Sequence, residues 1–169
     1  MDLFDKQIIP LSLADGRMAN IVFWPSWLGT VSAANLLDVA ITQTPWRTDF
    51  INIMGKKIPI PRLQNWFGDP STSYTYSRIR LQAVEFPKWM DKLRSDVEIE
   101  TGHPFNRALV NYYRDGSDSV DWHADNEREL GFEPVIASVS LGAERVFQLR
   151  HNVSTVSYTH LRAHETLQH

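Results

Sequence analysis

The sequence predicts an α+β fold that is mainly β, with a double-stranded β-helix (jelly roll) at its core and helices packed outside it. Short apolar runs separated by Gly and Pro indicate strands, and only two stretches have the apolar spacing of helices. The third observation is a His-x-Asp pair after the strand-like run 108–110. On a strand, side chains at i and i+2 leave the same face, so His123 and Asp125 can converge on one point.

The N-terminal elements follow from local signals. A strand is predicted over 20–24, where Asn-Ile-Val-Phe-Trp is stopped by Pro25. Ser32 has the side chain of an N-cap, and apolar residues on one face continue a helix from there to about Thr42. Pro45 ends that helix, which we interpret as scaffold.

The middle of the chain predicts a hairpin and a second helix. Residues 50–53 and 58–60 are strand-like and flank an exposed tip at 54–57. The second helix begins near Pro87 and ends before Gly102, with apolar residues at four-residue spacing between them. The core strands are then expected at about 108–113, 120–123, 135–141 and 145–149.

Length and composition set the class of protein. The 169 residues are enough for one domain with a real core, and 43% hydrophobic with 22% charged residues is typical of soluble globular chains. The absence of cysteine excludes disulfides and thiolate metal sites, so metal binding must rest on His, Asp and Glu. We expect no signal peptide at the acidic start, and no apolar run approaches membrane-spanning length. We expect a cytoplasmic monomer with no membrane segment.

The charge is unevenly distributed around a net value of −3. Residues 47–94 hold nine basic against four acidic residues, a surplus that suits contact with phosphates. Residues 95–133 hold ten acidic against three basic residues, which suits a cation. Two differently solvated faces would give the same pattern, so composition leaves both interpretations open.

The pair His123 and Asp125 supplies two members of the two-histidine, one-carboxylate triad that holds ferrous iron and leaves positions open for an oxidant. A bare His-x-Asp is also common as a surface or N-cap pair. The context favours a metal site, since a strand-like run precedes the pair, a turn lies at Asp115 and Gly116, and an apolar run follows.

The whole run from Asn111 to Glu127 resembles the AlkB family of iron- and 2-oxoglutarate-dependent dioxygenases. The family core has the order Asn-x-Tyr, a Gly-containing turn, His-x-Asp-x-Glu and a Ser-Val-Ser-Leu-Gly strand. This sequence has each element in that order, the last at 138–142, and the resemblance covers roughly 45–151.

The resemblance implies the cofactors and several roles. Fe(II) would be held by His123 and Asp125, with 2-oxoglutarate as cosubstrate and O2 as oxidant. Asn111 and Tyr113 match the pair that hydrogen-bonds 2-oxoglutarate, and an amide and a phenol are suitable donors for carboxylate oxygens. Glu127 matches a position that touches the damaged base. An ordinary strand and a loop carboxylate are the alternatives.

Four further residues match positions that contact nucleic acid in the family. Tyr74 and Tyr76 would stack on or bond to a flipped base, unless they only form a hydrophobic sheet face. Arg62 would pair with a phosphate or the base, or lie on the surface. Met54, at the hairpin tip, would wedge into the gap that the flipped base leaves.

The C-terminal end departs from the family. Residues 156–169 resemble the translation of a sequencing-library adapter, so we expect a dioxygenase domain over 1–155 and a non-native tail. The jelly roll would then lack its last strands, its second histidine ligand and the arginine that binds 2-oxoglutarate. His151, His160, His164 and His169 do not have the family context of that ligand, so we expect residues 1–169 to be inactive.

The leading functional prediction is oxidative demethylation (dealkylation) of N-alkylated bases in DNA repair, with DNA as the expected substrate and RNA left open. A non-catalytic nucleic-acid-binding module is the alternative, motivated by the aromatic and basic stretch 47–80. A related dioxygenase that acts on protein or small molecules is a third. The sequence leaves open which alkyl lesion is removed and whether the nucleic acid is duplex or single-stranded.

Overall fold

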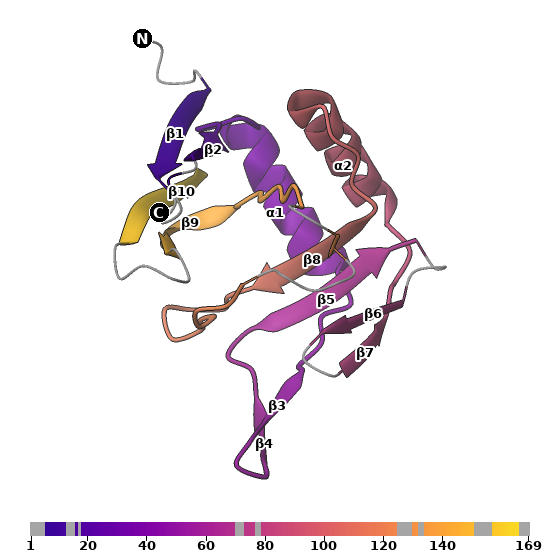
Figure 1. Cartoon of the computed structure of the whole chain (residues 1–169). Coiled ribbons are helices and arrows are strands. Elements are labelled where there is room, and N and C mark those ends of the chain that lie inside the picture. Colours follow the sequence, from indigo (N-terminus) through magenta and orange to yellow (C-terminus); the bar gives the residue numbers. More distant parts are fainter. Residues whose placement is uncertain are drawn as a thin grey trace. The chain divides into compact units, whose positions relative to one another are not determined.

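The computed structural model describes residues 6–12, 16, 18–69, 73–76, 79–124, 130–131, 134–150 and 157–165. For 73–76, 79–82 and 157–165 it describes the backbone alone. The chain forms two compact units, one of residues 1–40 and 138–169 and the other of residues 41–137. The described residues are mostly strands, paired antiparallel, with two helices (Figure 1).

The first unit contains two strand pairs. β1 (Gln7–Ser12) pairs antiparallel with β2 (Met18–Phe23), and β9 (Gly142–Arg150) pairs antiparallel with β10 (Ser157–Glu165). Most of α1 (Thr30–Gln43) belongs to the same unit, where its buried residues are alanines. β9 begins at Gly142, whose φ is +86°, and a Cβ there would lie 3.2 Å from a Leu37 methyl group. Glycine therefore suits this point for two independent reasons.

The second unit is built around β5 (Leu63–Gly68) and β8 (Arg107–Tyr112), which lie side by side (Figure 1). Every residue of β5 from Gln64 to Gly68 is buried, and Phe67 is only 1% exposed. The register places Gln64 opposite Asn111 and Phe67 opposite Ala108. Because side chains alternate, Asn111 and Phe67 belong to opposite faces of the pair. One face therefore carries Phe67; the other, which we call the polar face, carries Gln64 and Asn111 beside the buried Trp66.

Two hairpins complete the strands of this unit. β3 (Phe50–Ile53) pairs with β4 (Lys56–Pro59), and β6 (Ser73–Tyr76) pairs with β7 (Ile79–Gln82). The first hairpin turns at Met54 and Gly55, whose φ values are +49° and +80°. Positive φ at both central residues defines a type I′ turn, which matches the twist of the flanking strands.

The second helix has the ends that the sequence predicts. α2 (Lys88–Thr101) has Pro87 at its N-cap position, where a missing N–H is harmless. Gly102 follows in the left-handed conformation, and its N–H donates to the Glu98 carbonyl. Of the helices in the described ranges, none is both long and apolar enough to cross a membrane.

Two strand predictions are wrong. Residues 120–123 and 135–141 form no strand, and Val135 and Ile136 are 51% and 57% exposed. A strand needs hydrogen bonds to a neighbouring strand, and none of the described strands pairs with these segments. β10 forms beyond residue 155, in the part of the chain that the sequence predicts to be a non-native tail. The open edge of β9 offers unpaired backbone groups to any extended chain that returns to it.

Candidate active site

The polar face of the β5–β8 pair presents the two residues predicted to bind 2-oxoglutarate. Asn111 is exposed on β8, and Tyr113 is half-buried directly after that strand. Continuing the two-residue period places both side chains on one face, as the sequence predicts. Gln64 shares this face, where its amide donates to Asp49 over 2.8 Å.

Arg62 lies directly before β5 and is buried, with 6% of its surface exposed. Its Nε donates to Oδ1 of Asn111 over 3.1 Å, and one terminal nitrogen donates to the Ser119 carbonyl over 3.4 Å. The sequence predicts Arg62 as a contact for the base or a phosphate. In the structure, its described hydrogen bonds are made to the protein itself.

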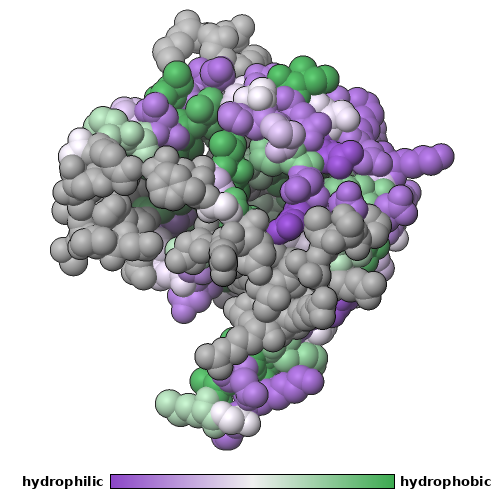
Figure 2. Space-filling model, turned by 45° about the vertical axis from the view of Figure 1, so that its right-hand side comes forward, coloured by the Kyte–Doolittle hydropathy of each residue, from purple (hydrophilic) through white to green (hydrophobic). Residues whose placement is uncertain are grey.

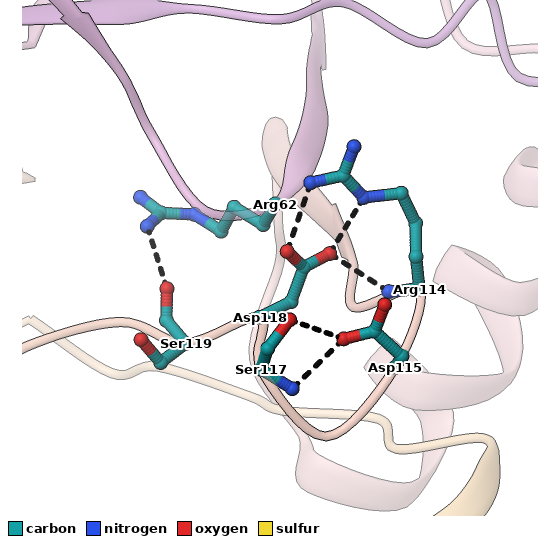
Figure 3. Close-up of polar contacts among 6 residues, drawn as sticks. All are labelled: Arg62, Arg114, Asp115, Ser117, Asp118 and Ser119. Carbon is teal, nitrogen blue, oxygen red and sulfur yellow. Dashed lines mark hydrogen bonds and ion pairs between the residues drawn. The ribbon is translucent and has the colours of Figure 1, made fainter.

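The loop after β8 is fastened by a second arginine (Figure 3). Asp118 is 4% exposed and accepts three hydrogen bonds from Arg114: one from the backbone N–H at 2.9 Å and two from the guanidinium at 2.7 and 2.8 Å. Hydrogen bonding to Asp118 raises the pKa of Arg114. A forked arginine–carboxylate pair fixes geometry as well as charge, so it defines the path of the chain toward His123.

The turn within this loop has its own carboxylate contacts. Asp115 accepts hydrogen bonds from the hydroxyl and the backbone N–H of Ser117, and these bonds lower the pKa of Asp115. The Ser119 N–H donates to the Pro61 carbonyl over 2.8 Å, which ties the end of the loop to the start of β5. The loop is thus held at both ends.

His123 is exposed, and its Nδ1 lies 2.8 Å from the Asp121 carbonyl oxygen. A carbonyl can only accept a hydrogen bond, so Nδ1 carries the proton in this contact. Nε2 is then the nitrogen with a lone pair for a metal ion. Metal-binding histidines in proteins commonly donate their other ring N–H in this way.

Asp125 and Glu127, the other predicted residues of the motif, lie outside the described residues. Within the described part of the chain no group of three or more His, Asp and Glu residues is placed to hold a metal. The donor set still fits ferrous iron in kind, since imidazole and carboxylate are the ligands of non-haem iron sites. The contact of His123 Nδ1 with the Asp121 carbonyl is compatible with ligation through Nε2.

The predicted contacts with nucleic acid lie on the two hairpins. The backbones of Tyr74 and Tyr76 belong to β6, two residues apart, which places them on one face of that strand. Met54 is 99% exposed at the turn of the β3–β4 hairpin. That hairpin is the projection at the bottom of Figure 2, where hydrophobic and hydrophilic residues lie next to one another. Lys57 stands 4.5 Å from the ring centre of Phe50 on it.

Sequence reasoning missed the residues that organise the site. Arg114 and Asp118 are four apart around the predicted turn, a spacing that could have indicated an ion pair. The contact between Arg62 and Asn111 spans 49 residues and carries no local signal. Its discovery required the fold.

Comparison with known proteins gives consistent relatives. A profile described as the 2OG-Fe(II) oxygenase superfamily matches residues 20–165, which include ten residues of the expected tail. Alpha-ketoglutarate-dependent dioxygenase alkB homolog 3 of Rattus norvegicus is 37% identical over 146 residues, 85% of this chain and 48% of that protein. The same protein of Mus musculus is also 37% identical, with 85% and 50% covered.

A second group of relatives matches a shorter stretch. DNA oxidative demethylase ALKBH2 of Bos taurus is 39% identical over 104 residues, which are 62% of this chain and 37% of that protein. The chain thus spans about half the length, or less, of these curated relatives.

Proposed function

This chain belongs to the 2OG-Fe(II) oxygenase superfamily and is AlkB-like, and from that membership we propose that it demethylates N-alkylated bases in DNA. Relatives that bear the names of a dioxygenase and a DNA oxidative demethylase support the reaction class and the substrate class. The single structural observation that carries the proposal is the ring of His123. Its Nδ1 lies 2.8 Å from the Asp121 carbonyl oxygen, so a metal ion would be bound through Nε2.

The residues that would hold the cofactors are those on the polar face and in the motif. His123 and Asp125 are the proposed iron ligands, and Asn111 with Tyr113 would donate to carboxylate oxygens of 2-oxoglutarate. When bound, iron and 2-oxoglutarate would allow O2 to hydroxylate an N-alkyl carbon, with conversion of 2-oxoglutarate to succinate and CO2. The hydroxyalkyl group would then leave the base as an aldehyde. The chain's own part is to orient the cosubstrate and hold the alkylated base beside the metal.

The proposal extends to the fold. Members of an Fe(II) oxygenase superfamily are expected to place their ligands on a double-stranded β-helix, and the antiparallel pairing of β5 with β8 is compatible with one part of such a jelly roll. In that arrangement Asn111 would face the inside of the barrel.

Nucleic acid would approach from the hairpin side of the second unit. An enzyme that modifies a base must take it out of the stack and hold it by stacking and edge contacts, for which Tyr74, Tyr76 and Glu127 are the proposed residues. Met54, fully exposed at a turn, would fill the gap in the duplex, as apolar wedges do in proteins that unstack DNA. Lys56 and Lys57 beside it suit phosphate contacts.

The experiment is release of formaldehyde from an N-methylated oligonucleotide in the presence of Fe(II), 2-oxoglutarate and O2. It uses a protein in which this domain is completed by a second histidine ligand and an arginine for 2-oxoglutarate, because residues 1–169 alone are expected to release none. We expect equal amounts of formaldehyde and succinate, and no formaldehyde when 2-oxoglutarate is omitted. An unmethylated oligonucleotide is the matched control. Succinate formation without demethylation would reject the nucleic-acid substrate, and absence of both products with folded, iron-loaded protein would reject the reaction class.

Salt-dependent binding to DNA that does not need metal, together with no turnover, would instead support the non-catalytic binding module. Turnover of a peptide or a small molecule in place of DNA would support the third alternative. Binding should therefore be measured with and without metal, in parallel with the turnover assay.

A further inference from the structure

Arg62 is the buried cation of the second unit that the proposed reaction does not yet use. Only 6% of its surface is exposed, and it lies directly before β5, on the same face of the strand pair as Asn111. A buried guanidinium needs hydrogen-bond partners, since its desolvation is otherwise costly. The hydrogen-bond partners of Arg62 therefore indicate which elements it holds in place.

The partners of Arg62 come from two elements that carry the candidate site. Nε donates to Oδ1 of Asn111 on β8, and a terminal nitrogen donates to the carbonyl of Ser119 in the loop that leads to His123. Figure 3 shows the guanidinium directed at Ser119 and away from the Arg114–Asp118 pair. The Ser119 N–H returns a hydrogen bond to Pro61, so the two segments are linked in both directions.

The first of these contacts orients the Asn111 amide. A guanidinium has donors only, so the atom of Asn111 that faces it must be the carbonyl oxygen. The NH2 group of Asn111 is then held on the opposite side of the amide. Without Arg62 the amide could rotate and present its oxygen to an incoming carboxylate, which would repel it.

We infer that Arg62 is a positioning residue that fixes the Asn111 amide with its NH2 group toward a carboxylate of 2-oxoglutarate, and that it does not contact the alkylated base. This inference rests on the proposed function. The guanidinium also adds a fixed positive charge, shielded from water, beside the position that a dianionic cosubstrate would take. Both effects act on the affinity for 2-oxoglutarate and leave oligonucleotide binding unaffected.

The test measures 2-oxoglutarate binding by calorimetry in the domain completed by the second histidine ligand and the arginine for 2-oxoglutarate, with Mn(II) in place of iron to prevent turnover. Arg62→Met should weaken binding about tenfold, the effect of one misaligned hydrogen bond to a charged group. Asn111→Ala should weaken it to a similar extent. The double variant should bind no more weakly than the weaker single variant, because residues that act through one contact are not additive.

Two further variants make the result specific. Arg47→Met removes an exposed arginine that pairs with Asp49 near the same strand, and it should leave 2-oxoglutarate affinity unchanged. Arg62→Lys keeps the positive charge but lacks the planar set of guanidinium donors, so it should lose only part of the affinity for 2-oxoglutarate. If Arg62→Met does not fold, the coupling between Arg62→Lys and Asn111→Ala decides the question.

Two results overturn the inference. Additive losses in the double variant would show that Arg62 does not act through Asn111. Unchanged 2-oxoglutarate affinity with weaker binding of an N-methylated oligonucleotide would make Arg62 a substrate contact. Failure of the proposed function itself would look different, because the unsubstituted protein would then bind no 2-oxoglutarate at all.

Discussion

Phe67→Leu should lower the stability of the second unit without lowering its affinity for 2-oxoglutarate. Phe67 is 1% exposed in β5 and lies opposite Ala108, on the face of the strand pair that Asn111 does not share. The substitution removes part of the ring from the core and should not alter the backbone of β8. Stability and cosubstrate binding are therefore separable across the two faces.

The magnitude follows from burial. Phe→Ala in a packed core costs about 3–5 kcal/mol, which approaches the whole stability of a small domain. Leucine retains most of the apolar contact, so the expected loss is about 1–2 kcal/mol. For a chain of this length that corresponds to a decrease in Tm of about 2–8 °C, which leaves the protein folded at 25 °C.

The assay is urea unfolding followed by tryptophan fluorescence, with 2-oxoglutarate binding measured by calorimetry on the same samples. Leu109→Ala is the comparison for stability, because Leu109 is 38% exposed on the polar face and should cost less than about 1 kcal/mol. If Phe67→Leu weakened 2-oxoglutarate binding tenfold in protein that is still folded, the separation of the two faces would be wrong.

Three more predictions concern the motif, the hairpin and the turn. In the completed domain, His123→Ala should abolish iron binding and turnover, measured as bound iron and formaldehyde release, because an imidazole ligand is lost. Met54→Ala should slow demethylation of duplex more than of single-stranded DNA, measured as initial rates on matched oligonucleotides, since only the duplex has a gap to fill. Asp115 should stay ionised to a lower pH than an aspartate in the unfolded chain, because the hydrogen bonds from Ser117 lower its pKa. Its contribution to loop stability is then present above the unfolded aspartate pKa and lost as pH falls through the folded one, which an NMR titration of the carboxyl carbon measures.

Each of these has a contradicting result. Near-normal iron content in His123→Ala would show that His123 is not an iron ligand. Equal slowing on duplex and single-stranded DNA would show that Met54 does not fill a gap in the duplex. For the turn, a titration midpoint of Asp115 that does not rise in Ser117→Ala would show that those hydrogen bonds are not the cause of the lowered pKa.

Elements with local signals could be predicted from the sequence. Pro87 and Gly102 bound α2, and the alternating residues around Met54 and Gly55 form the β3–β4 hairpin. Asn111 could be placed on a strand because a strand-like run precedes it. In each case the information lies within about a dozen residues of the element.

Features that depend on distant partners could not be predicted. Residues 134–141 have the composition of a strand but pair with none of the described strands, and composition cannot reveal a missing partner. The sequence predicts Arg62 as a contact for a phosphate or the base, or as a surface residue, since arginine is usually exposed. Its burial depends on contacts to Asn111 and Ser119, which are 49 and 57 residues away.

The turn of the β3–β4 hairpin sets thermostability against the proposed role of Met54. Met54 has a left-handed backbone conformation, which is unfavourable for a methionine side chain. Asparagine and glycine are the common residues at this position of a type I′ turn. Met54→Asn should therefore make the protein more heat-resistant. Selection for thermostability alone would favour that change and would remove the exposed thioether, which is the group proposed to fill the gap in duplex DNA.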